Sequence, residues 1–141
     1  MAGFRKIGGS SDSAAWKERV IGAVAYNVGD LLMASRTAGT LTAATSSATV
    51  SLLQGGGIVM KATDGVETKV LIDPIDFNAV YEVESANASN TAHNYMRMAL
   101  TDEDTVNNSG SDDGTNGVVQ QVGKSGINTT TILVEFLRAL T

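Results

Sequence analysis

The sequence predicts an all-β protein, an antiparallel barrel or sandwich with an extended N-terminal arm. Short apolar runs with the two-residue alternation of strands recur along the chain, separated by loops rich in Gly, Ser, Thr and Asn. About ten such runs follow one another at intervals of roughly 8–12 residues, a spacing typical of sandwiches and barrels. The 141 residues suit one domain, and a chain of that size buries roughly 68–70% of its unfolded surface.

Residues 1–19 are assigned to the arm and residues 20–141 to a single domain. The arm contains a Gly- and Ser-rich stretch at 8–13 and too little apolar content to fold alone. It is also the basic end of the chain. Residues 1–19 carry a net charge of +2, so the remaining residues carry −7 and the whole chain −5. A short helix beginning near Asp12 is an alternative, because Asp is a good N-cap.

In the first half of the domain, the alternation and the turn residues predict five strands. The first of them has apolar residues on both faces, so we expect both faces to be buried. The glycines at 55–57 are interpreted as a turn in which a positive φ costs nothing. The predicted strands cover residues 20–28, 29–33, 40–44, 49–53 and 58–63.

The second half of the domain continues the pattern after the hairpin turn Asp64-Gly65. A long loop over 101–117 carries a charge of −5 with no basic residue. The last segment also fits one face of a helix, but its Thr-rich start favours a strand. The predicted strands cover residues 66–73, 81–84, 95–100, 118–122 and 129–140.

The composition argues against several classes of function. The net charge of −5 makes nucleic acid an unexpected partner, since phosphate binding needs a basic stripe. The chain contains no cysteine and one histidine, His93, which we interpret as an ordinary loop residue, so we expect no metal or other cofactor. No secretory signal and no run of about 18 apolar residues is found, so a membrane partner is not expected either.

Carboxylates are the only plentiful reactive groups. Glu82 and Glu84 share one face of a strand and could flank a glycosidic bond as paired acids do, but a solvated outer face is the favoured interpretation. The acidic loop could hold a weak calcium site, yet aligning Gly114 with the invariant glycine of an EF-hand loses two essential carboxylates. A solvated loop is favoured there too. We therefore expect a protein without catalytic residues and without enzymatic activity.

The arm supplies the candidate binding residues. Phe4 and Ile7 flank Arg5 and Lys6 in a segment that cannot bury them locally, and Trp16 follows further along. Such a segment suits a tail that becomes ordered on an acidic partner or on a neighbouring subunit. Plain disorder of the arm is the alternative.

From Tyr26 onward, the order of sequence elements resembles the small decoration, or cement, proteins on the heads of tailed bacteriophages. The resemblance covers most of the chain after the arm, but it is a pattern of common residue types and contains no diagnostic motif. The acidic loop has no counterpart in that family. The matching elements are Val28-Gly-Asp-Leu-Leu32, the Thr/Ala/Ser stretch at 40–47, Gly57-Ile-Val-Met-Lys-Ala-Thr63, Val70-Leu-Ile-Asp-Pro-Ile75, Val80-Tyr-Glu-Val83, and Gly117-Val-Val-Gln-Gln-Val-Gly123 before a strand ending at Phe136.

The resemblance implies a β-tulip or jelly-roll-like domain that forms a homotrimer on the capsid exterior. Its partners would be the major capsid protein and other copies of itself. It would be a structural viral protein of the virion, made in the host cytoplasm, that clamps neighbouring capsid subunits together. Phe4 to Ile7 is where the arm would contact the capsid or an adjacent protomer. The alternative is a carbohydrate- or receptor-binding β module of a phage fibre or adhesin.

Overall fold

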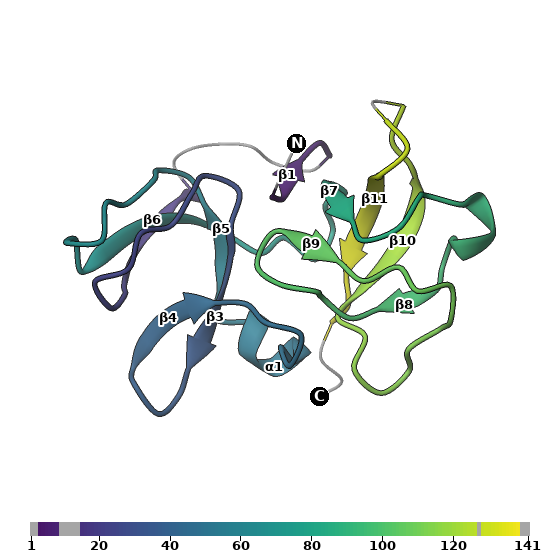
Figure 1. Cartoon of the computed structure of the whole chain (residues 1–141). Coiled ribbons are helices and arrows are strands. Elements are labelled where there is room, and N and C mark those ends of the chain that lie inside the picture. The colour runs from purple at the N-terminus through teal and green to yellow at the C-terminus, as the bar shows by residue number, and fades with distance from the viewer. Residues whose placement is uncertain (1–2, 9–14, 127, 139–141) are drawn as a thin grey trace.

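The computed structural model describes residues 3–8, 15–126 and 128–138. Two antiparallel sheets pack as a sandwich, which confirms the predicted all-β fold class. The sheets lie side by side, with the first strand of the chain above their junction and a short helix below it (Figure 1). The chain completes most of one sheet before it enters the other.

The first sheet curls until its two edges meet. A bridge between Ile21 and Leu41 joins the end of its first strand to its last, and a small apolar core lies inside the curl. Tyr26 and Ile72 belong to this inner core and are 4% and 1% exposed. The strands, in the spatial order β2-β6-β5-β3-β4, are β2 (Lys17–Val20), β6 (Lys69–Pro74), β5 (Gly57–Val59), β3 (Leu31–Ser35) and β4 (Thr40–Ala43).

The second sheet carries the C-terminal half of the chain. A bridge between Leu100 and Val106 draws its ends together, and β9 pairs with β7 in parallel. The C-terminal segment is a strand, because Ile132, Val134 and Phe136 alternate into the core. The strands, in the spatial order β1-β7-β11-β10-β8 with β9 beside β7, are β1 (Arg5–Lys6), β7 (Tyr81–Ser85), β11 (Thr131–Phe136), β10 (Val119–Lys124), β8 (Arg97–Met98) and β9 (Thr105–Val106).

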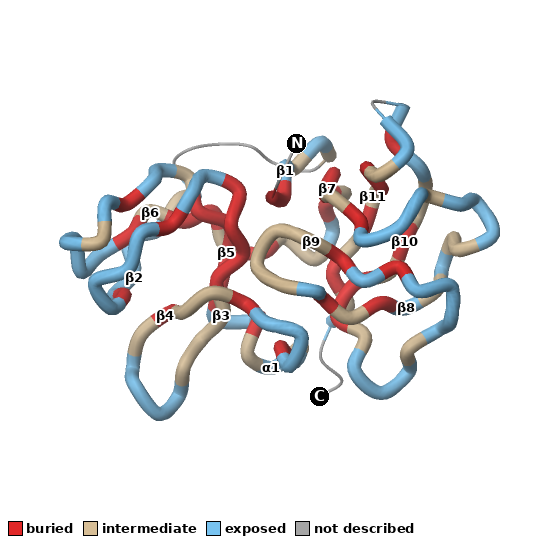
Figure 2. The backbone as a smooth tube through the Cα atoms, viewed as in Figure 1, coloured by how far each residue is buried: buried red, intermediate tan, exposed pale blue. Residues whose placement is uncertain are grey.

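The main core lies between the sheets, and strand alternation explains how the first sheet serves two cores. Leu31 and its cross-strand partner Ile58 point towards the second sheet, whereas Leu32 and Val59 point into the inner core. Figure 2 shows the buried backbone running along β5 and through the second sheet. Because both faces of β3 and β5 are buried, these strands hold the two cores in a fixed relation.

The predicted strand over 20–28 is wrong beyond its first residues. Val24 and Val28 on one predicted face are 48% and 57% exposed, and Ala23 and Ala25 on the other are exposed too, so the two faces are not buried as expected. The hydroxyl of Thr63 takes the place of a strand ladder here: it accepts from Tyr26 N at 2.9 Å and donates to Val24 O at 2.8 Å. Side-chain hydrogen bonds of this kind let the backbone leave the regular ladder.

The predicted strand over 49–53 is also wrong, because these residues form the helix α1 (Val50–Leu53). Thr49 caps it: the Thr49 hydroxyl accepts a hydrogen bond from Leu52 N at 3.2 Å. Capping by a Thr side chain satisfies a backbone donor that a helix start leaves free. Leu53, 1% exposed, then anchors the helix in the main core.

The glycines that follow α1 are needed for close packing of the backbone. The predicted turn is present at Gly55, after α1, but none of the three glycines has a positive φ. A Cβ at Gly56 would lie 1.9 Å from Leu32 O, and one at Gly57 would lie 2.4 Å from Asp73 O. Only glycine allows β5 to lie this close to the strands beside it.

Candidate partner-binding site

A pocket of about 200 Å³ lies at the junction of the two sheets, beneath β1. Four of the five residues predicted to bind a partner line it, namely Phe4, Arg5, Lys6 and Trp16. The structure therefore brings together residues that the sequence separates by the stretch 9–14, which lies outside the described residues, as does the helix start predicted at Asp12. This pocket is the candidate site.

The backbone of residues 3–8 holds the site together because it bonds to both sheets. Phe4 N donates to Gly29 O beside the first sheet at 2.7 Å, and Ile7 N donates to Val80 O beside the second at 2.9 Å. Gly3 has a φ of 91°, and a Cβ there would lie 2.9 Å from the backbone of Gly29. Residues 3–8 are thus wedged between the sheets.

Phe4 forms the floor of the pocket and belongs to the main core of its own chain. It is 3% exposed, and its ring centroid lies 5.4 Å from that of Phe136 and 6.5 Å from that of Tyr81. This burial could not be predicted from the sequence, because the residues that cover Phe4 are distant along the chain. Phe4 therefore supports the site from below.

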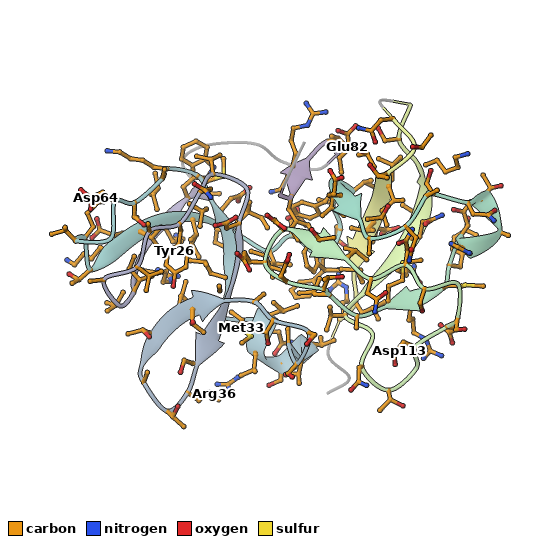
Figure 3. The ribbon with its side chains drawn as sticks, in the orientation of Figure 1. Tyr26, Met33, Arg36, Asp64, Glu82 and Asp113 are labelled. Atoms are coloured by element: carbon orange, nitrogen blue, oxygen red, sulfur yellow. The ribbon has the colours of Figure 1, made fainter. Side chains whose placement is uncertain are left out.

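Arg5 and Lys6 point in opposite directions, as successive strand residues do. The Arg5 guanidinium pairs with Glu82 on β7, whereas Lys6 Nζ lies 2.9 Å from Asp73 and 3.9 Å from Asp76 at the end of β6. Both side chains of the Lys6–Asp73 pair are 10% exposed, so this ion pair is buried and links β1 to the first sheet. Figure 3 shows Glu82 beside β1.

The rim of the pocket is apolar and partly open. Ile7, next to the site, is 46% exposed, and Val28, on the rim, is 57% exposed, while Trp16 is half-buried. The volume lies below the range of about 300–1,000 Å³ usual for small-molecule sites. A space of this size with apolar walls fits one apolar side chain of a partner protein better than a drug-sized ligand.

The paired carboxylates do not form an open acid pair. Glu82 is 7% exposed, contrary to the solvated face expected for it, because its carboxylate binds Arg5 and accepts from Ser125 Oγ at 3.4 Å. The hydroxyl of Thr130 donates to Glu84 Oε1 at 3.1 Å. Both carboxylates therefore serve contacts within the second sheet.

The acidic loop packs at the junction of the sheets, against the start of β3. Leu31 N donates to Glu103 O at 2.8 Å, and Gly3 N donates to Asp104 O at 3.3 Å. Within the described ranges, no three His, Cys, Asp or Glu side chains come together as metal ligands. The loop contributes its backbone to the fold and is not simply solvated.

Asp30 makes the stability of this junction depend on pH. Burial raises the pKa of its carboxyl, the Asn27 N–H hydrogen bond opposes that shift, and the charges of Glu103 and Asp102 add to it. The folded state therefore binds this proton more tightly than the unfolded state, so the contribution of Asp30 to stability should rise as pH falls from 7 towards about 4. We expect Asp30→Asn to raise the midpoint of urea unfolding at pH 7 and to flatten its pH dependence between those limits. An unchanged pH dependence would contradict this assignment.

Comparisons with known proteins found no relative: no family model, no curated protein and no solved structure matched the chain. In the part of the chain that the structure describes, no helix is long and apolar enough to cross a bilayer. The fold and the site together define an all-β sandwich with an apolar pocket, flanked by ion pairs, at the junction of its sheets.

Proposed function

We propose that this chain is a structural virion protein that decorates the outside of a phage capsid and bridges neighbouring capsid subunits. The observation that carries the proposal is the junction pocket, whose exposed apolar rim suits an inserted side chain of another protein. The sequence resemblance described above supplies the class of partner, the major capsid protein. The resemblance also supplies the trimeric state.

The polar groups around the pocket support a binding role over a catalytic one. Lys6 and Glu82, the most reactive side chains beside the pocket, are held in ion pairs with Asp73 and Arg5. Groups fixed in this way are already engaged within the fold, where they keep the pocket open and in shape. We accordingly propose that the protein is not an enzyme.

A pocket for one side chain gives only weak binding by itself. A trimer would place three such pockets on a symmetric shell, and linked contacts raise the overall affinity by about 10²–10⁴ without any new contact. Small, repeated contacts of this kind suit a protein that bridges subunits. The proposal therefore couples capsid binding to oligomerisation.

The test is sedimentation of the purified chain with the capsids of its source, combined with native mass measurement. Val28→Asp places a charge on the pocket rim and should reduce capsid binding at least about tenfold, the equivalent of ~1.4 kcal/mol. Val66→Asp is the matched control, because Val66 is 78% exposed and does not line the pocket. A monomer that never sediments with capsids would refute the proposal, as would equal binding by both variants.

A further inference from the structure

Tyr95 has a backbone conformation that non-glycine residues rarely adopt. Its φ is 70°, the only positive value for a non-glycine residue in the described part of the chain, and its side chain is 72% exposed. Its N–H donates to Gln121 O at 2.6 Å, which holds the strained backbone in place. An aromatic residue rarely adopts this conformation, so an exposed ring kept there at a cost points to a function outside the core.

Gln121 lies beneath Tyr95 and ties the loop down. It is fully buried and pairs across β10 and β11 with Val134, on the face that meets the core. Its Nε2 donates to Asn90 O and to Asn94 Oδ1, each at 2.9 Å. The loop on either side of the helical turn η2 (Thr91–His93) is therefore fixed from below.

The same region contains all the unsatisfied buried polar side-chain atoms among the described residues: Ser89 Oγ, His93 Nδ1 and Gln121 Oε1. Buried polar groups in native proteins are nearly always hydrogen-bonded. Strain and unmet hydrogen bonds that gather in one loop mark a site selected for something other than stability. The strained Tyr95 and these three atoms therefore mark the loop around η2 as a candidate binding site.

The surface around Tyr95 is polar but almost uncharged. Residues 85–96 contain no Asp, Glu, Lys or Arg, and neither do residues 107–111. The two stretches are neighbours, since Asn87 N donates to Asn108 Oδ1 at 2.7 Å. Asn90 and Asn94 use their amide oxygens within the loop, accepting from Ala92 N and from Gln121 Nε2, so their amide protons can point to a ligand.

We propose that this loop, with Tyr95 as its platform, is a binding site for a neutral carbohydrate. A sugar presents an apolar C–H face that stacks on an aromatic ring, and hydroxyls that accept from amide N–H groups. An uncharged ligand matches this surface, because the nearest charged side chains, Arg97 and Asp112 at its border, are paired with each other at 2.6 Å. The site is separate from the junction pocket and does not depend on capsid binding.

The direct test is an NMR titration of the labelled full chain with neutral oligosaccharides. The probes are malto-, cello-, manno- and chito-oligosaccharides at millimolar concentration, each run separately. We expect at least one of them to shift the amide signals of residues 89–96 and 107–110, with the signals around Val28 unchanged. If no probe shifts these signals, or if the shifts map elsewhere, the proposal is wrong.

Two variants separate a binding role for Tyr95 from a purely structural one. Tyr95→Gly should raise the melting temperature, because glycine adopts a positive φ freely, and should weaken sugar binding at least tenfold. Tyr95→Phe keeps the ring and should bind within about threefold of the parent, since the stacking face is unchanged. Wild-type sugar binding by Tyr95→Gly would overturn the proposal whatever happens to its stability. Capsid sedimentation of the same variants should be unaffected, so the two proposals fail independently.

Discussion

Replacing Phe4 with alanine should lower the free energy of unfolding by about 3–5 kcal/mol, the usual cost of removing a buried phenylalanine. Phe4 is 3% exposed and contacts the rings of Tyr81 and Phe136, so its removal leaves a cavity at the junction of both sheets. Urea unfolding followed by circular dichroism measures this change. Deletion of residues 1–8 should cost more, because it removes the buried Lys6–Asp73 ion pair as well.

Ile7→Ala is the control for this prediction. Ile7 lies on the same segment but is 46% exposed, so its truncation should cost less than about 1 kcal/mol. Equal stability of Phe4→Ala and the parent would show that Phe4 contributes nothing to its own core. The Phe4 side chain would then be available for an external partner, as predicted from the sequence alone.

Replacing Lys6 with methionine should destabilise the fold by about 3–5 kcal/mol, because the change leaves the buried carboxylate of Asp73 without its countercharge. Both side chains of the pair are 10% exposed, and Asp76 at 3.9 Å adds a second negative charge nearby.

The double variant Lys6→Met/Asp73→Leu tests whether the loss comes from the unpaired charge. It should recover most of the stability, because replacing both partners of a buried pair with apolar residues is often neutral. Lys69→Met is the matched control: the Lys69–Glu18 pair is 3.5 Å apart with side chains 63% and 66% exposed, so its loss should cost less than about 1 kcal/mol. Comparable losses in Lys6→Met and Lys69→Met would argue against a buried role.

The strands β7, β10 and β11 of the second sheet could be predicted from their alternation, whereas β1 and β9 lie in segments predicted as arm and loop. Tyr81 and Val83 point into the core, and so do Ile132 and Val134 opposite them. The predictions failed where a side chain supplies the hydrogen bonds. The Thr63 hydroxyl replaces the hydrogen bonds of a strand pair beside Val24, and the Thr49 hydroxyl caps a helix where the residue types favour a strand. Neither role can be predicted from the spacing of apolar residues.

The candidate site was predictable in its residues but not in its geometry. The sequence singled out Arg5 and Lys6, flanked by Phe4 and Ile7, in a segment that cannot bury them locally. It could not show that Asp73 and Tyr81 receive them, because such contacts between distant residues leave no local pattern. Tyr95 was read as an ordinary strand residue, since no property of the sequence signals a positive φ at a tyrosine.

The junction pocket is built from segments that lie far apart along the chain. Residues 5 and 6 pair with β7, and Phe4 contacts the ring of Phe136, which lies far from it along the chain. The pocket walls therefore come together only when both sheets have formed and docked on each other. A partner that fills the pocket selects finished molecules, and by mass action it holds them in that finished state.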